Sequence, residues 1–144
     1  MPHRTLRQIV GEQDLLQVSP RTNVLDAACR MAERHVAAVL VTDKGSLQGI
    51  FTERDLLRRV IVPGLSPKET EVGDVMSHHP IAIGADLTGT DALRVMSEAD
   101  IRHIVVEGVG ADGFAILSMR DFFTGEVAAA EREIDFQRQL WEDL

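Results

Sequence analysis

The apolar and polar positions of this chain predict the same order of helices and strands twice. Apolar residues three and four apart predict helices, and short apolar runs bounded by turn residues predict strands. In the first half, the predicted elements are a short helix over 5–10, a strand over 15–18, a helix over 23–35, strands over 37–42 and 47–52, and a helix over 53–62. In the second half, they are a short helix over 72–76, a strand over 80–83, a helix over 88–99, and strands over 102–107 and 114–118. With the last helix, which is expected from Arg120, each half follows the order β-α-β-β-α after its short first helix.

The residues themselves repeat along with the pattern. Residues 49–56 (GIFTERDL) return as residues 115–122 (AILSMRDF), and residues 26–31 align with residues 91–96. The offset is 65 residues in the earlier blocks and 66 in the closing motif, so one insertion in a loop separates the two copies. An internal repeat fixes the architecture before any propensity argument does. We predict an α/β fold of two tandem units that share a core.

Two stretches lie outside the repeated pattern. Residues 64–71 are polar, with Pro and Gly, and predict a linker between a first domain over 5–63 and a second domain over 72–125. The last helix is expected from Arg120 almost to Leu144, so that residues 126–144 extend beyond the second domain. Its apolar residues follow a 4-3 spacing that Gln137 interrupts, at Phe123, Val127, Ala130, Ile134 and Trp141. This helix either packs on its own domain or forms a dimer contact, and the spacing does not decide between the two.

Composition and charge narrow the class of protein. The chain has 144 residues, 44% of them hydrophobic, which predicts a folded body, and its net charge of −8 argues against a nucleic-acid partner. No apolar run approaches the roughly 18 residues of a membrane span, and Met1-Pro2-His3-Arg4 begins no signal segment. The single cysteine, Cys29, lies at a helical position where we expect core packing. These features favour a cytoplasmic protein with no membrane partner.

One motif carries the candidate chemistry and has two interpretations. Thr52-x-x-Asp55 and Ser118-x-x-Asp121 each stand between a strand and a helix. In the first interpretation, the hydroxyl caps the helix and the Asp complements the helix dipole. In the second, the free backbone N–H groups of the helix N-terminus bind phosphate and the Asp accepts hydrogen bonds from ribose hydroxyls. Arg54 and Arg120 precede the two aspartates and are placed to screen phosphate charge.

The whole chain resembles a pair of CBS domains, the family named after cystathionine β-synthase. The resemblance rests on residues 49–55 (GIFTERD), 118–121 (SMRD) and 101–106 (IRHIVV), together with Val75-Met76 followed by His79-Pro80-Ile81. It covers roughly residues 5–125 and implies two units that pack through their sheets about a pseudo-twofold axis. It also implies that AMP, ADP, ATP, NAD or S-adenosylmethionine occupies the clefts between the units, with AMP as the preferred candidate.

The resemblance assigns roles to particular residues. By carry-over, Thr52 and Ser118 bind phosphate or ribose, and Asp55 and Asp121 bind the ribose diol. The base pockets are expected at first-strand and second-strand residues, namely Val18, Ile81, Ala38 and His103. The second copy of the motif has Ala115 in place of Gly49. We expect that methyl group to narrow its cleft, so that the two sites differ in ligand or occupancy.

Other chemistry has less support in the sequence. His78-His79 has no well-spaced Cys or acidic partner, which favours a solvated loop over a metal site. His103 is either a hydrogen-bonded core residue or a base contact. No Ser-His-Asp or Cys-His arrangement indicates an enzyme, and Glu53 and Asp55 do not face each other on a helix.

We therefore expect a non-catalytic, energy-sensing regulatory module that binds an adenosine-containing ligand. It would signal through an unidentified protein partner or through its own dimer, because the resemblance implies a homodimer. The alternative is a dimeric interaction scaffold that binds no ligand.

Overall fold

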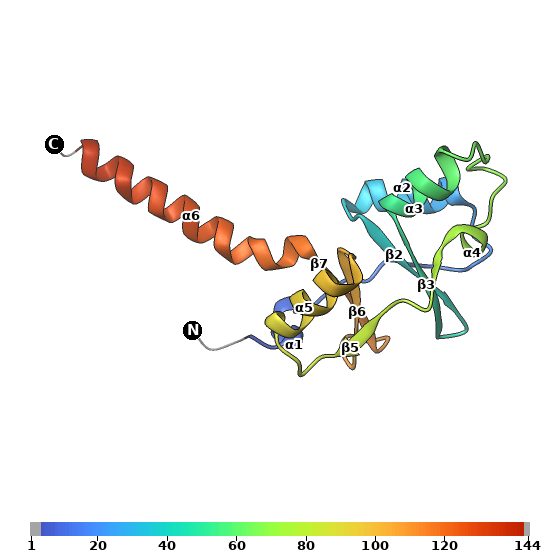
Figure 1. Cartoon of the computed structure of the whole chain (residues 1–144), viewed down its shortest axis with the longest axis horizontal. Helices are drawn as coiled ribbons and strands as arrows, with labels where there is room; N and C mark the ends of the chain where they lie inside the picture. The colour runs from blue at the N-terminus through green and yellow to red at the C-terminus, as the bar shows by residue number, and fades with distance from the viewer. Residues whose placement is uncertain (1–3, 143–144) are drawn as a thin grey trace.

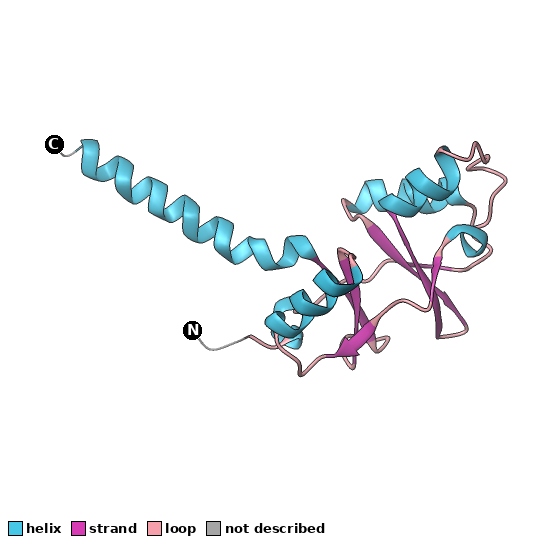
Figure 2. Cartoon of the chain, in the orientation of Figure 1, coloured by secondary structure: helices cyan, strands magenta, loops and turns pink. Residues whose placement is uncertain are grey.

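The computed structural model describes residues 4–142, with side chains placed for all of these except 123–132 (Figure 1). Two small β-sheets lie next to each other, and the shorter helices cover their outer faces (Figure 2). The elements are α1 (Leu6–Val10), β1 (Gln17–Val18), α2 (Val24–Arg34), β2 (Ala38–Asp43), β3 (Ser46–Thr52), α3 (Glu53–Asp55), η1 (Leu56–Ile61), α4 (Val72–Val75), β4 (Ser77–His78), β5 (Ala82–Gly84), α5 (Gly89–Ala99), β6 (His103–Glu107), β7 (Phe114–Ser118) and α6 (Met119–Glu142). The predicted α/β fold of two units is confirmed.

The two sheets share one topology, apart from an extra strand in the first. In the order β1-β2-β3-β4, β1 is parallel to β2, and the remaining neighbours are antiparallel. In the order β5-β6-β7, β5 is parallel to β6, and β6 and β7 form an antiparallel hairpin. The sequence pattern did not predict β4, because two polar residues show no apolar alternation.

Side-chain caps fix where the main helices begin. Asn23 accepts a hydrogen bond from the backbone N–H of Asp26 at the start of α2, at 2.8 Å. Thr88 and Asp91 form a capping box at the start of α5. Such caps satisfy N–H groups that have no partner inside the helix. Both helices end at a residue in the left-handed region, His35 at φ 54° and Asp100 at φ 53°.

The units exchange their first helices. Leu6 of α1 is fully buried in the core of the second unit, with Ala92 and Met96 of α5. Val72 and Val75 of α4 are buried in the core of the first unit. The exchange is reciprocal. Thr5, which precedes α1, forms a β-bridge with Thr88, the N-cap of α5, and Glu71, which precedes α4, forms a β-bridge with Asn23, the N-cap of α2. Neither core is complete without a helix from the other half of the sequence.

A third cluster of apolar side chains lies between the sheets. Ala38, Leu40 and Ile50 of the first sheet pack with Val105 and Ile116 of the second. These residues alternate along their strands with residues that face the helices, so each strand is buried on both faces. This cluster holds the two units face to face.

Residues 64–71, expected as a linker, contact the first unit. The backbone N–H groups of Val24 and Leu25 at the start of α2 donate to the carbonyl oxygens of Thr70 and Pro67, both at 2.9 Å. The segment therefore completes the cap of α2 while it leads the chain to α4.

Two expectations about buried positions are wrong. Cys29 is exposed, because Val24, Ala27 and Met31 turn the other face of α2 toward the sheet. Leu57 and Ile61, whose apolar spacing was part of the reason to predict a helix over 53–62 and implied a buried face, are also exposed. Residues 56–61 form a π-helical turn, in which the backbone N–H of Val62 donates to the carbonyl of Leu57, so the α-helical spacing does not apply there.

The last helix, α6, extends away from the body of the protein (Figure 1). All of the described side chains from 133 to 142 are exposed, including Ile134 at 52% and Trp141 at 77%. This part of α6 does not pack on its own domain, so that interpretation is wrong for it. The side chains of Phe123, Val127 and Ala130 lie outside the described residues, and the dimer contact stays a prediction.

The outer edges of β3 and β7 are paired differently, and one residue position explains the difference. An ideal Cβ on Gly49 of β3 would lie 2.6 Å from the carbonyl oxygen of Ser77, so the glycine allows β4 to pair there. Ala115 stands at the equivalent place in β7, where none of the described strands pairs. Instead, the Gln13 side-chain amide donates to the carbonyl of Ile116 and accepts from its N–H, both at 2.8 Å. A side chain replaces the strand.

This arrangement corrects the expectation for Ala115. Its methyl group is buried in the core of the second unit with Leu117 and does not line a cleft. The methyl therefore does not narrow the cleft of its unit. The Gly/Ala difference acts on the sheet edge.

We expect Gly49→Ala to lower the free energy of unfolding by about 1–3 kcal/mol, because the new methyl group forces β4 away from β3. Gly84→Ala is the matched control, since a Cβ at that strand position meets no atom within 4 Å. Urea denaturation of both variants measures the difference. An equal effect of the two substitutions would contradict the packing argument.

Candidate functional site

Two clefts lie between the units, and each contains one copy of the S/T-x-x-D motif. The first cleft, of about 570 Å³, is lined by Thr52 and Asp55 of the first unit and by Ile81 and His103 of the second. The second cleft, of about 370 Å³, is lined by Ser118 and Asp121 of the second unit and by residues 13–16 and Ala38 of the first. Both volumes are in the range of small-molecule sites. Each cleft thus combines the motif of one unit with strand residues of the other.

Nine of the ten predicted site residues line these clefts. The first cleft brings together Thr52, Arg54, Asp55, Ile81 and His103. The second brings together Ser118, Arg120, Asp121, Ala38 and again His103.

The tenth predicted residue, Val18, lies elsewhere. It is 4% exposed and packs in the core of the first unit, because its side chain faces the helices. Leu16 lines the second cleft in its place. The offset of 65 residues between the copies relates Ile81 to Leu16, so the repeat itself indicated which residue lines the second cleft.

In the first cleft, the Asp55 carboxylate is surrounded by donors from its own unit. It accepts hydrogen bonds from the backbone N–H and the hydroxyl of Thr52, at 3.0 and 3.1 Å, and from the hydroxyl of Ser77 at 3.1 Å. The Nε of Arg59 lies 3.6 Å from its Oδ1. Thr52 in turn accepts from the backbone N–H of Asp55, so the capping-box interpretation is confirmed here. Asp55 is left only 6% exposed.

In the second cleft, the same motif has a different geometry. From the described residues, Asp121 accepts one hydrogen bond, from the backbone N–H of Ser118 at 2.8 Å, and it stays partly exposed. The hydroxyl of Ser118 accepts from the backbone N–H of Arg120 at 3.1 Å. A carboxylate has about four lone-pair positions, so Asp121 retains acceptor capacity that Asp55 has largely used. The N-terminus of α6, which has 24 residues, opens at this point.

His103 lies where the two clefts meet and lines both of them. Burial lowers the pKa of its imidazole below the usual 6.5, against the opposing charges of Glu53 and Asp121. The ring is therefore neutral at pH 7, with one donor and one acceptor nitrogen. Such a ring contributes hydrogen bonds to a ligand and no positive charge.

Sequence reasoning missed several residues that line the clefts. Ser77, Arg58 and Arg59 belong to the first cleft, Gln13 belongs to the second, and Arg102 lines both. Charged residues on a short predicted helix are usually interpreted as its solvent-exposed face. No spacing in the sequence indicates the π-helical turn that carries Arg58 and Arg59.

Two further searches concern metal ions and membranes. Among residues 4–142, no group of three or more His, Cys, Asp or Glu side chains is placed to hold a metal ion. His78 lies in β4, and His79 follows it at φ 50°. Across the same part of the chain, no helix combines the length and apolar character that a membrane crossing needs.

Comparison with known proteins gives a consistent result. The CBS domain family matches this chain over residues 7–62 and again over 72–124. The CBS domain-containing protein CBSCBSPB2 of Arabidopsis thaliana is 42% identical over 92 residues, which are 63% of this chain and 17% of that protein. The chain thus spans about a sixth of the length of this relative.

Solved structures share the fold over most of the chain. A protein with CBS domains from Burkholderia ambifaria is 27% identical, with a TM-score of 0.78 over 87% of this chain and 95% of that one. A CBS domain protein from Pyrobaculum aerophilum, complexed with AMP, is 20% identical, with a TM-score of 0.70 over 82% of this chain and 89% of that one. Together with the two-unit fold and its paired clefts, these matches establish that the chain belongs to the CBS domain family, as a tandem pair of CBS domains.

Proposed function

We propose that this protein is a non-catalytic regulatory module that binds an adenosine-containing ligand, AMP first among them, between its CBS units. One observation carries the proposal: in each cleft, the S/T-x-x-D motif of one unit faces strand residues of the other. A ligand in such a cleft contacts both units at once. The AMP bound by the structurally similar Pyrobaculum aerophilum protein supports this ligand class.

The second cleft has the features that AMP needs. The N-terminus of α6 offers backbone N–H groups and a positive dipole end to a phosphate. The partly exposed Asp121 has acceptor capacity for the two ribose hydroxyls. Ala38 and Ile116 give apolar surface for the base, beside the neutral His103.

Regulation follows from the position of the ligand between the units. A ligand that binds one relative orientation of the units more tightly shifts the population toward that orientation. A partner protein, or a second copy of the chain, can also bind one orientation of the units more tightly than the other. The ligand and that partner then change each other's affinity by the same factor. AMP would therefore change the affinity for that partner.

The proposal of a non-catalytic role rests on the family, because the chain matches the CBS domain model over both of its units. The hydroxyl of Thr52 donates to Asp55 within its capping box, and the hydroxyl of Ser118 accepts from the backbone N–H of Arg120.

We expect AMP at 100 times its dissociation constant to raise the melting temperature by roughly 5–10 °C, because binding then adds about 2.7 kcal/mol to stability. Asp121→Asn is expected to weaken binding about tenfold through the loss of charge-assisted hydrogen bonds to ribose. Asp86→Asn, whose carboxylate is 90% exposed, is the matched control. Thermal-shift measurements on ligand-free protein test both.

The same panel includes ADP, ATP, NAD and S-adenosylmethionine. If no adenosine-containing ligand shifts the melting temperature at millimolar concentration, the ligand-binding function is wrong. The scaffold alternative would then remain, and the motifs would serve only as helix caps.

We also propose that the protein forms a homodimer, in which α6 contributes to the contact. The exposed apolar side chains of its distal half support this proposal, namely Ile134, Phe136, Leu140 and Trp141. A second exposed apolar set lies in η1 and just after it, at Leu57, Ile61, Val62 and Leu65. Apolar surface of this extent is typical of association sites.

We expect the double variant Ile134→Ser and Trp141→Ser to weaken the dimer without changing the melting temperature of the body. Asp135→Ser with Gln139→Ser, which changes another face of the same helix, is the control. Light scattering should give twice 15.9 kDa for the wild type and the control, and a lower mass for the apolar variant. A dimer of equal strength in all three proteins would exclude this face of α6 from the contact.

A further inference from the structure

The two clefts carry different sets of charged side chains. Four arginines line the first cleft against three acidic residues, namely Arg54, Arg58, Arg59 and Arg102 against Glu53, Asp55 and Asp100. Two arginines line the second cleft against three acidic residues, namely Arg102 and Arg120 against Asp14, Glu53 and Asp121. The balance of charge therefore favours an anion in the first cleft more than in the second.

The arginines of the first cleft have N–H donors that no described residue accepts from. Arg54 donates one hydrogen bond to the carbonyl of Asp100, at 3.2 Å, across the boundary between the units. Arg59 donates to the carbonyl of Met76 at 2.8 Å and lies beside Asp55. Arg58 has no hydrogen bond or ion pair with any residue that the structure describes. A guanidinium carries five N–H donors, so most of those in this cluster are open to a ligand.

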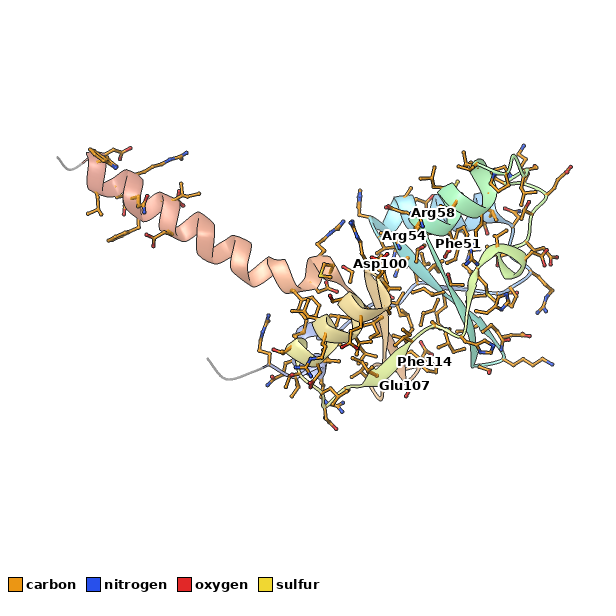
Figure 3. All side chains as sticks on the ribbon, viewed as in Figure 1. Phe51, Arg54, Arg58, Asp100, Glu107 and Phe114 are labelled. Carbon is orange, nitrogen blue, oxygen red and sulfur yellow. The ribbon has the colours of Figure 1, made fainter. Side chains whose placement is uncertain are left out.

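The π-helical turn explains why two consecutive arginines line the same cleft. A turn with i→i+5 hydrogen bonds holds more residues than an α-helical turn, so positions four and five after Arg54 both return to its side of the helix. Those positions are Arg58 and Arg59. Figure 3 shows Arg54 and Arg58 on the same helical segment, with Asp100 nearby in the other unit.

The second copy of the motif lacks this cluster. At the offset of 66 residues, Arg54 corresponds to Arg120, but Arg58 and Arg59 correspond to Thr124 and Gly125. The residues that follow the second motif are also part of a continuous α-helix. Among the described residues, the extra cationic groups therefore line the first cleft and not the second.

The motif aspartate of the second cleft is more available to a ligand than that of the first. Asp55 is 6% exposed and already accepts hydrogen bonds from Thr52 and Ser77, whereas Asp121 accepts one backbone hydrogen bond. A ribose diol thus finds an open carboxylate in the second cleft. In the first cleft, binding energy has to come mainly from phosphate groups.

We propose that the first cleft selects nucleoside di- and triphosphates, with Arg58 contacting the outer phosphates, while the second cleft takes a nucleoside monophosphate. This assignment rests on the proposed function and divides it between the two clefts. Each added phosphate brings further negative charge and acceptor oxygens, which the planar guanidinium groups bind through paired hydrogen bonds. A monophosphate does not reach as many of them.

Isothermal titration of ATP and AMP, in magnesium-free buffer, tests the assignment. Arg58→Gln is expected to raise the dissociation constant of ATP about tenfold, the effect of one lost charge-assisted contact, and so to lower the preference for ATP over AMP by a similar factor. Arg94→Gln, an exposed arginine of α5 that lines neither cleft, is the matched control and leaves that preference unchanged. Inorganic tripolyphosphate should compete with ATP in the wild type and less well in Arg58→Gln.

Asp121→Asn separates the two clefts. We expect it to weaken AMP binding while ATP binding continues at the first cleft. If Arg58→Gln leaves the ATP-to-AMP preference unchanged, or if Arg94→Gln lowers it equally, the assignment is wrong, although AMP binding by the wild type would still support the proposed function. If the wild type binds neither nucleotide, the proposed function fails and the assignment fails with it.

Discussion

The packing of one sheet against the other is the interaction on which the rest of this structure depends. Leu40 and Ile50 in the first sheet and Val105 and Ile116 in the second are removed from water by each other. Burial of such side chains is the main favourable term in folding. The two clefts lie beside this contact, because Ala38 and Ile116 also line the second cleft and Ile50 also lines the first.

Small sequence differences make the two clefts chemically unlike within one fold. In both motifs, a strand ends at a hydroxyl residue and an Asp follows in the first turn of a helix. Asp55 contacts Ser77 and Arg59, whereas Asp121 accepts a hydrogen bond from the backbone N–H of Ser118. Ser77 can approach because Gly49 admits β4 to the sheet edge. In the second unit, Gln13 satisfies that edge with a side chain. A duplicated site has thus acquired two environments through changes in residues that flank the motif.

The repeat explains why the fold could be predicted so fully from the sequence. Two copies of one apolar pattern reinforce each other, and turn residues mark the ends of the strands. Features that do not alter the apolar pattern were missed, namely the two-residue β4 and the π-helical turn after Asp55. The predicted burial of Cys29 was wrong, because residue spacing alone does not say which side of the helix faces the sheet. Nine of the ten predicted residues line the clefts because they belong to the motif or to segments beside it, whereas the placement of Arg58 and Arg59 depends on a local backbone geometry that no residue pattern predicts.

The exchanged helices have a consequence for how the chain folds as it is synthesised. Leu6 emerges from the ribosome before every residue that it packs against, since its partners lie in α5 and in β7. The first unit is complete once His78 has emerged, because α4 and β4 follow it directly in the sequence. The second unit has to recover a helix made at the beginning, after a fully formed neighbour already stands between the two segments. Segments far apart in the sequence pair slowly, so docking of α1 is the step that couples completion of the second unit to the order of translation.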